Sequence, residues 1–113
     1  MRYLLLICAD ETVQLSAEES ATMQSATESW VAEMDSRGVR LQGEPLRPVS
    51  DATTVRVRGG ETLVSDGPFA ETKEQIAGFD VLECADLDEA VEVASRHPVA
   101  RIGTVEVRPF WQE

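Results

Sequence analysis

The chain of 113 residues has few of the groups from which active sites are commonly built. It has one histidine and two cysteines, and nowhere do they show the spacing of a metal site, a nucleophile motif or a phosphate-binding loop. No metal and no other cofactor is therefore predicted. Cys8 and Cys84 lie within apolar runs and form no C-x-x-C motif, which favours buried, reduced thiols over a disulfide.

Basic residues and long apolar runs are also scarce. Ten Lys and Arg residues stand against 21 Asp and Glu residues, so the net charge of −11 repels phosphate backbones and anionic lipid headgroups. Nucleic acid is not an expected partner. The longest apolar run, residues 3–9, is far shorter than the roughly 20 residues that span a membrane, and it leads to no signal-peptide cleavage site. We expect a cytoplasmic protein that does not bind membranes.

The composition that remains is that of a globular protein. Hydrophobic residues make up 42% and charged residues 27%, and the length fits a single domain over residues 1–113 with a real core. Residues 3–9 form a short run that is apolar on both faces, which favours a central strand. Alternation along it directs Leu4, Leu6 and Cys8 to one face and Leu5 and Ile7 to the other.

Two helices are predicted. The first covers residues 17–37, because Ser16 and Glu19 form a capping box and Gly38 supplies a left-handed stop. The second begins after Asp86 and ends at His97-Pro98. Their predicted apolar stripes are Met23, Ala26, Trp30 and Met34 in the first helix, and Leu87, Ala90, Val91 and Ala94 in the second.

Extended segments fill the rest of the chain. The segment after Gly38 is broken by Gly43 and Pro45 and is confined to an irregular or edge position. "TTVRVR" and "ETLVS" form a hairpin around Gly59-Gly60, and "IAGFDVLEC" and "GTVEVR" are further strands. The order β-α-β-β-β-β-α-β predicts an α+β, ferredoxin-like protomer with an antiparallel sheet and both helices on one face.

That arrangement leaves the second face of the sheet uncovered, although the first strand is apolar on both. A second copy of the chain is the simplest cover, so we expect a homodimer formed through the sheet.

The stretch "DGPFAETKEQIAGF" gathers the first candidate site residues. Asp66 before Gly67-Pro68 is either a turn-former or, if the turn directs it into a cleft, an acid or base. Glu71, Lys73 and Glu74 are either a solvated loop or a place where Lys73 holds a ligand carboxylate or Asp66 itself.

Two further positions have competing interpretations. His97 is either a general base or a cation stabilised at the C-terminus of the second helix. Arg56 and Arg58 either line a polar interior that binds an anion or pair with Glu106 across neighbouring strands.

The quoted motif, with "RYLLLICADE", "TTVRVRGGETLVS", "DLDEAVEVA" and "GTVEVRPF", resembles the YCII-related proteins of the DGPF type along nearly the whole chain. The resemblance implies a dimeric α/β-barrel of ferredoxin-like protomers in the bacterial cytosol. It also implies a genomic association with extracytoplasmic-function sigma factors.

Other YCII-type proteins look like small-molecule enzymes that use a histidine in the first helix and an aspartate just before a late proline. This chain has no histidine in residues 17–37, and His97 itself precedes Pro98, so that dyad cannot be carried over.

The prediction is a homodimer that binds a small molecule in a cleft near the DGPF segment and is linked to sigma-factor regulation. The alternative is a lyase or isomerase acting by acid–base chemistry. The candidate catalytic residues are Asp66 and His97, and the candidate ligand-binding residues are Lys73, Glu71, Phe69 and Arg56.

Overall fold

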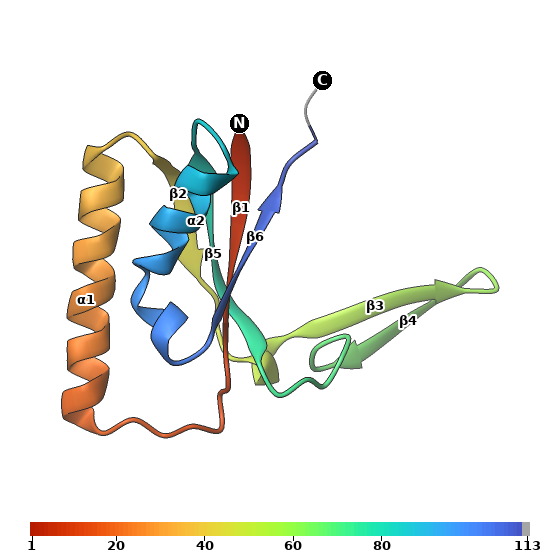
Figure 1. Cartoon of the computed structure of the whole chain (residues 1–113). Helices are drawn as coiled ribbons and strands as arrows, with labels where there is room; N and C mark the ends of the chain where they lie inside the picture. Colours follow the sequence, from red (N-terminus) through yellow and green to blue (C-terminus); the bar gives the residue numbers. More distant parts are fainter. Residues whose placement is uncertain (112–113) are drawn as a thin grey trace.

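A computed structural model describes residues 1–111 of the chain. The elements follow the predicted order (Figure 1), and their bounds are β1 Arg2–Ala9, α1 Ala17–Ser36, β2 Arg40–Pro45, η1 Val49–Asp51, β3 Thr53–Arg58, β4 Glu61–Asp66, β5 Gln75–Glu83, α2 Leu87–Ser95, η2 Pro98–Arg101 and β6 Thr104–Pro109. The two η elements are short 3-10 helices.

The boundaries of the helices are set by the residues that the sequence pointed to. The Ser16 hydroxyl accepts a hydrogen bond from the Glu19 backbone N–H, and the Glu19 carboxylate accepts one from the Ser16 backbone N–H, both at 3.0 Å. At the other end of α1, Gly38 has a φ of 70°, the left-handed conformation that glycine adopts most readily. In α2, the Asp86 carboxylate accepts from the Glu89 backbone N–H at 2.9 Å. The capping predictions are confirmed.

Four strands form an antiparallel sheet in the order β2-β5-β1-β6, which places β1 at the centre and makes β2 an edge strand. Both helices cover the same face of this sheet (Figure 1). The architecture is therefore α+β and consistent with a ferredoxin-like fold.

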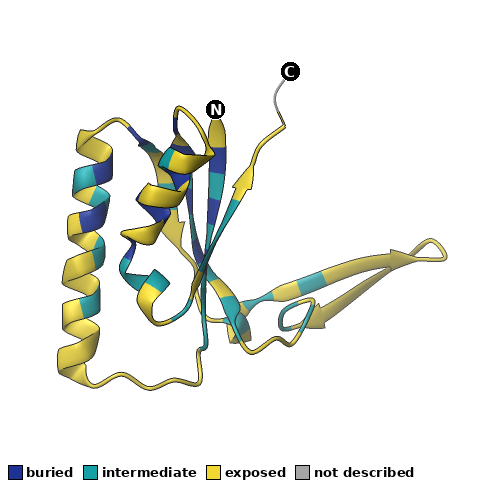
Figure 2. Cartoon of the chain, in the orientation of Figure 1, coloured by how far each residue is buried: buried dark blue, intermediate teal, exposed yellow. Residues whose placement is uncertain are grey.

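The core lies between the helices and the inner face of the sheet (Figure 2). Tyr3 and Leu5 of β1 pack there with Leu82 of β5, and Trp30 and Met34 of α1 complete the layer. The Trp30 indole N–H donates to the Val93 carbonyl at 3.0 Å, which ties α1 to α2. Of the predicted stripe on α1, Met23 is only half-buried and Ala26 is exposed.

In α2, the predicted stripe is partly wrong. Ala90 and Ala94 are buried as expected, but the third buried residue is Val93, while Leu87 and Val91 are about half exposed at 51% and 50%. Val93 therefore belongs to the face of α2 that packs into the core with Ala90 and Ala94.

The hairpin is the main departure from the expected single sheet. Strands β3 and β4 pair only with each other and project from the body as an arm, defined here as residues 53–66 (Figure 1). Gly59 and Gly60 both have positive φ, as a tight hairpin turn requires, so the hairpin itself is confirmed. The arm raises the radius of gyration to 16.0 Å, against about 13 Å for a compact chain of this size.

The outer face of the sheet has no covering element among residues 1–111. Leu4 and Leu6 of β1 lie beside Val81 and Phe79 of β5, their register partners on this face. All four are partly exposed, whereas Leu5 on the inner face is fully buried.

Candidate functional site

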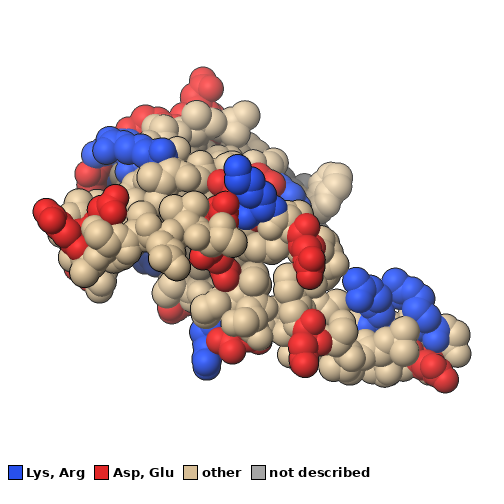
Figure 3. Space-filling model, turned by 90° about the horizontal axis from the view of Figure 1, so that it is seen from below, with Lys and Arg blue, Asp and Glu red and all other residues tan. Residues whose placement is uncertain are grey.

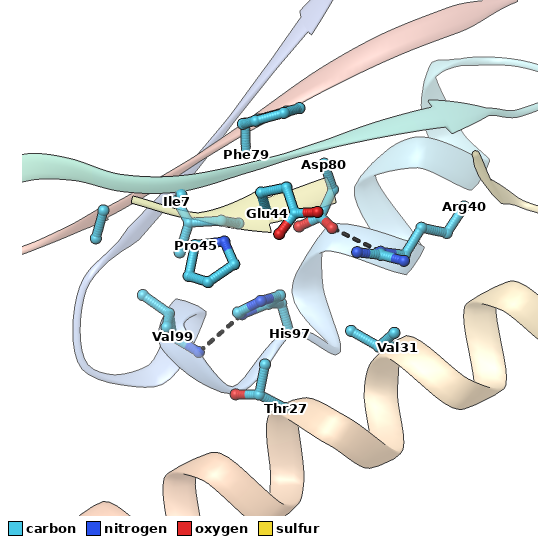
Figure 4. A pocket seen from close by; sticks show the side chains of 12 residues that line it. Ile7, Thr27, Val31, Arg40, Glu44, Pro45, Phe79, Asp80, His97 and Val99 are labelled. Atoms are coloured by element: carbon cyan, nitrogen blue, oxygen red, sulfur yellow. Dashed lines mark hydrogen bonds and ion pairs between the residues drawn. The ribbon is translucent and has the colours of Figure 1, made fainter. Parts of the chain in front are cut away.

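A pocket of about 260 Å³ lies between α1 and the β2 edge of the sheet (Figure 4). Helix α1 contributes Thr27 and Val31, β1 contributes Ile7, and β2 contributes Pro45. The remaining wall comes from β5 and from the turn that follows α2. Seven of the twelve lining residues are apolar, counting Gly78, and the polar or charged ones are Thr27, Arg40, Glu44, Asp80 and His97.

One wall contains a buried ion pair. Asp80 is 5% exposed, and its Oδ1 accepts a hydrogen bond from Arg40 Nε at 2.8 Å. Arg40 also donates to Asp35 Oδ1 at 3.2 Å and to the Gly43 carbonyl at 3.0 Å, so it links β2 to both α1 and β5. Burial raises the pKa of the Asp80 carboxyl, and the hydrogen bond from Arg40 opposes this shift.

Gly43 allows this pair to form. A side chain at position 43 would place its Cβ 2.0 Å from Asp80 Oδ1 and 2.6 Å from an Arg40 nitrogen. The carboxylate and the guanidinium therefore occupy the space that any other residue would need.

His97 forms another part of the wall. It is 4% exposed, and its ring packs edge-on against Trp30 with 4.7 Å between ring centroids. It caps the start of η2, where Nδ1 accepts a hydrogen bond from the Val99 backbone N–H at 3.1 Å. Burial lowers the pKa of His97 to about 4, so the imidazole is neutral at physiological pH.

The interpretation of His97 as a cation at the end of the second helix is therefore wrong. Helix α2 ends at Ser95, and the histidine side chain turns inward and caps the next element instead. Desolvation in the core opposes the charged form, and this effect outweighs the attraction of a helix C-terminus for a cation.

The DGPF segment lies elsewhere, at the base of the arm. Gly67 has a φ of 97°, its backbone N–H donates to the Ala52 carbonyl at 2.8 Å, and its carbonyl accepts from the Thr54 hydroxyl at 2.7 Å. Within residues 1–111 no hydrogen bond reaches the Asp66 carboxylate, so the backbone and Thr54 hold this turn. Asp66 is exposed, and Phe69 is 77% exposed.

The other predicted ligand-binding residues lie on the same exposed part of the chain. Glu71 and Lys73 are exposed in the loop between β4 and β5. Of all the predicted site residues, only His97 lines the pocket beneath α1. The structure does not bring Asp66 and His97 together there.

The predicted pairing of Arg56 and Arg58 with Glu106 is wrong within the chain. In the arm, Arg56 lies opposite Leu63 and Arg58 opposite Glu61, while Glu106 is in β6 and forms an ion pair with Arg108. Arg56 instead donates to the Phe69 carbonyl at 3.4 Å. The arm leaves the sheet before its arginines can reach β6.

The sequence reasoning missed Asp80 and Arg40. The available signal was Asp80 in the apolar strand "IAGFDVLEC", on the same face as Leu82, because a carboxylate that shares a face with core residues needs a partner. Which cation would supply that partner could not be read from the strand itself.

Of the two cysteines, Cys84 is buried as expected, whereas Cys8 is only half-buried. Cys8 and Cys84 are both free thiols, and burial raises the pKa of Cys84 to about 11, which keeps it protonated. No helix within residues 1–111 has the length and apolar character needed to cross a membrane.

Comparison with known proteins decides the family. The YCII-related domain matches residues 1–113. The chain belongs to the YCII-related family. It is also similar to an uncharacterized protein of Rhizobium meliloti (strain 1021), with 41% identity over 104 residues, covering 77% of this chain and 84% of the relative.

Proposed function

We propose that this YCII-family protein binds a compact small molecule in the pocket between α1 and the β2 edge of the sheet. The observation that carries the proposal is the pocket itself: about 260 Å³ of space with apolar walls and a few buried polar groups, His97 and Asp80 among them. Ligand sites have this composition, and the volume lies just below the usual range of about 300 to 1,000 Å³, which suits a compact ligand. The proposal places the site away from the DGPF segment, because only His97 among the predicted residues lines this pocket.

The family resemblance supports the same location. The YCII-type enzymes that the sequence resembles take their dyad from the first helix and from the residue before a late proline. Here α1 contributes Thr27 and Val31 to the pocket, and the residue before Pro98 contributes His97. The same two elements therefore form walls of one cavity, although the side chains differ.

Filling the pocket tests the proposal. Ligand-observed NMR with a library of small fragments should find binders to the wild-type protein. Val31→Trp should abolish their binding, because the larger side chain occupies the cavity. The matched control is Ala32→Trp, which adds the same indole to the neighbouring exposed position of α1. Equal fragment binding by both variants, or no binder to the wild type, would contradict the proposal.

An acid–base enzyme of the lyase or isomerase kind is the second candidate, and Asp80 is the observation that favours it. A buried carboxyl with a raised pKa, in a pocket shared with a neutral histidine, is a common arrangement for proton transfer. Turnover of a bound fragment that is lost in Asp80→Asn and kept in Asp88→Asn, the same change at an exposed position of α2, would establish catalysis. Binding without turnover supports the binding module.

We also propose that the functional unit is a homodimer that covers the outer sheet face and the arm. One face of the arm presents Val55, Val57 and Val64, each at least 58% exposed. Figure 2 shows how little of the arm is covered. A lone two-stranded hairpin is only marginally stable in water, so the arm requires a packing partner.

The available areas support a combined interface. Four strands of about six paired residues present roughly 400 Å² of flat surface, and the two strands of the arm add roughly 200 Å² per face. A stable interface buries about 800 Å² of accessible surface on each partner. This accessible surface follows the contours of the side chains, so it is larger than the flat area of the same patch. The sheet face alone falls well short, whereas the sheet face and the arm together approach this value.

Charge is also compatible with a second copy of the chain as the partner that covers the arm. The only Lys or Arg residues in the arm are Arg56 and Arg58, and the chain as a whole has a net charge of −11. Figure 3 shows basic side chains on the arm with an acidic one near its end, and side chains of both signs on the visible face of the body. The arm also contains Glu61 and Asp66, so it is formally neutral and can lie against the acidic body of a second copy without the repulsion that two such bodies exert on each other.

Sedimentation equilibrium tests the dimer. The wild type should have twice the mass of one chain, and Val64→Lys should weaken association because it places a charge on the apolar face of the arm. Ser65→Lys makes the same change on the opposite face and should preserve the dimer. A wild-type monomer at micromolar concentration would refute the proposal. The link to sigma-factor regulation stays a prediction from the family resemblance.

A further inference from the structure

The hydrogen bond to Val99 fixes which nitrogen of His97 carries the proton. Nδ1 accepts from the Val99 backbone N–H at 3.1 Å, so it has no hydrogen of its own. In a neutral imidazole the single N–H must then be on Nε2. The pocket therefore contains a hydrogen-bond donor whose position and protonation are set by the backbone of η2.

This donor has no acceptor within the protein. Among residues 1–111 no hydrogen bond from Nε2 is present, although the residue is only 4% exposed. Nε2 is nevertheless partly accessible to solvent. Within residues 1–111, a side-chain oxygen or nitrogen that is both fully buried and without a hydrogen-bond partner is found in Glu106 alone. Because Nε2 also has no partner, it is not fully buried. His97 lines the pocket, so the pocket is the space from which this N–H can be reached (Figure 4).

Arg40, the cation of the wall, is already engaged, and Asp80 is engaged through its Oδ1. Arg40 donates to Asp80, to Asp35 and to the Gly43 carbonyl, which leaves its charge balanced by two carboxylates. A ligand carboxylate would have no free cation to pair with there, and the Glu44 carboxylate is also part of the lining. An ammonium group has no lone pair with which to accept from the imidazole N–H.

We infer that the pocket selects an uncharged carbonyl compound with a compact apolar body, whose oxygen accepts a hydrogen bond from Nε2–H of His97. This inference rests on the proposed small-molecule site and adds the chemical class of its ligand. The apolar body meets Val31, Pro45 and Val99, and the carbonyl oxygen satisfies the free donor. His97 is then a specificity-determining residue, while the Asp80–Arg40 pair closes the wall beside it.

The first test concerns the tautomer and needs no ligand. His97 is the only histidine in the chain, so every imidazole nitrogen signal in an ¹⁵N NMR spectrum belongs to it. Long-range ¹H–¹⁵N correlation at neutral pH should show the proton on Nε2 and a bare Nδ1. A proton on Nδ1, or on both nitrogens, would overturn the inference irrespective of what the pocket binds.

The second test uses three probes of similar size: 1-tetralone, its hydrocarbon counterpart tetralin, and 1-naphthoate. The wild type should bind tetralone about tenfold more tightly than tetralin, the usual effect of one hydrogen bond, and naphthoate more weakly than tetralone. In His97→Asn the tetralone preference should fall to near one. Asparagine can still cap η2 through its amide oxygen, but its shorter side chain removes the donor at Nε2.

The outcomes separate this inference from the proposed function. Equal binding of tetralone and tetralin, or tighter binding of naphthoate, would overturn the carbonyl preference and leave the small-molecule site standing. A tetralone preference that survives in His97→Asn would show that another group supplies the donor. If none of the three probes binds and the fragment screen is also empty, the proposed site itself is refuted.

Discussion

Acidification should destabilise the folded protein through His97, and the effect can be isolated with one substitution. The imidazole has a pKa of about 4 in the folded chain, against an ordinary value of 6.5, because it is buried. Between these two values the unfolded chain binds the proton and the folded chain does not. Stability therefore falls as the pH is lowered from about 6.5 to about 4.

The size of the effect follows from the shift in pKa. One pKa unit corresponds to about 1.4 kcal/mol, so the full shift in the pKa of His97 corresponds to about 3 kcal/mol of folding stability. This stability is fully present above pH 6.5 and is lost as the pH falls toward 4. Within the window the free energy of unfolding should change by up to about 1.4 kcal/mol per pH unit. The charged groups facing His97 across the pocket are Asp80, Arg40 and Glu44. The raised pKa of Asp80 acts in the opposite direction, since its folded carboxyl takes up a proton first.

His97→Asn removes the titrating group and keeps an acceptor for the Val99 N–H. Urea unfolding of both proteins, followed by circular dichroism at pH 4.5, 5.5, 6.5 and 7.5 and at one protein concentration, gives the difference in stability. The contributions of the carboxylates that both proteins share should largely cancel. The advantage of the wild type should shrink by about 2 to 3 kcal/mol from pH 7.5 to pH 4.5. A difference that stays constant over this range would show that His97 is not held neutral in the fold.

Three further substitutions test the packing. Trp30→Ala should cost about 3 to 5 kcal/mol in chemical denaturation, because Trp30 is 5% exposed and joins α1 to α2; a loss below about 1 kcal/mol would show that this stripe faces solvent. Gly43→Ala should cost about 1 to 3 kcal/mol, because its Cβ must displace the carboxylate of Asp80; an unchanged urea midpoint would mean that the ion pair shifts freely. Gly67→Val should lower the melting temperature through backbone strain of about 1 to 3 kcal/mol, since a Cβ there meets no atom within 4 Å; full retention of the melting temperature would remove the special role of this turn.

Local sequence determined most of the secondary structure. The capping box at Ser16, the left-handed Gly38 and the Gly59-Gly60 turn each act over a few residues, so their effect can be read without knowing the rest of the fold. The alternation along β1 divided its side chains correctly into two sets, and the structure shows that Leu5 and Ile7 are the set that faces the helices.

The tertiary structure alone decided how these pieces meet. Val93 of α2 is buried in the core in place of Val91, and the arm leaves the sheet and takes Arg56 away from β6. Neither outcome follows from periodicity, since a periodic pattern fixes the spacing of a face and not the element that it contacts.

The candidate site shows the same division. The sequence singled out His97 as a titratable residue beside Pro98, but its charge depends on burial against Trp30, a residue 67 positions earlier in the chain. Asp80 and Arg40 are 40 positions apart, and only the pairing of β2 with β5 joins them over Gly43. Desolvation and the competition between partners are set by three-dimensional proximity, which is why the chemistry of the pocket emerged only from the folded chain.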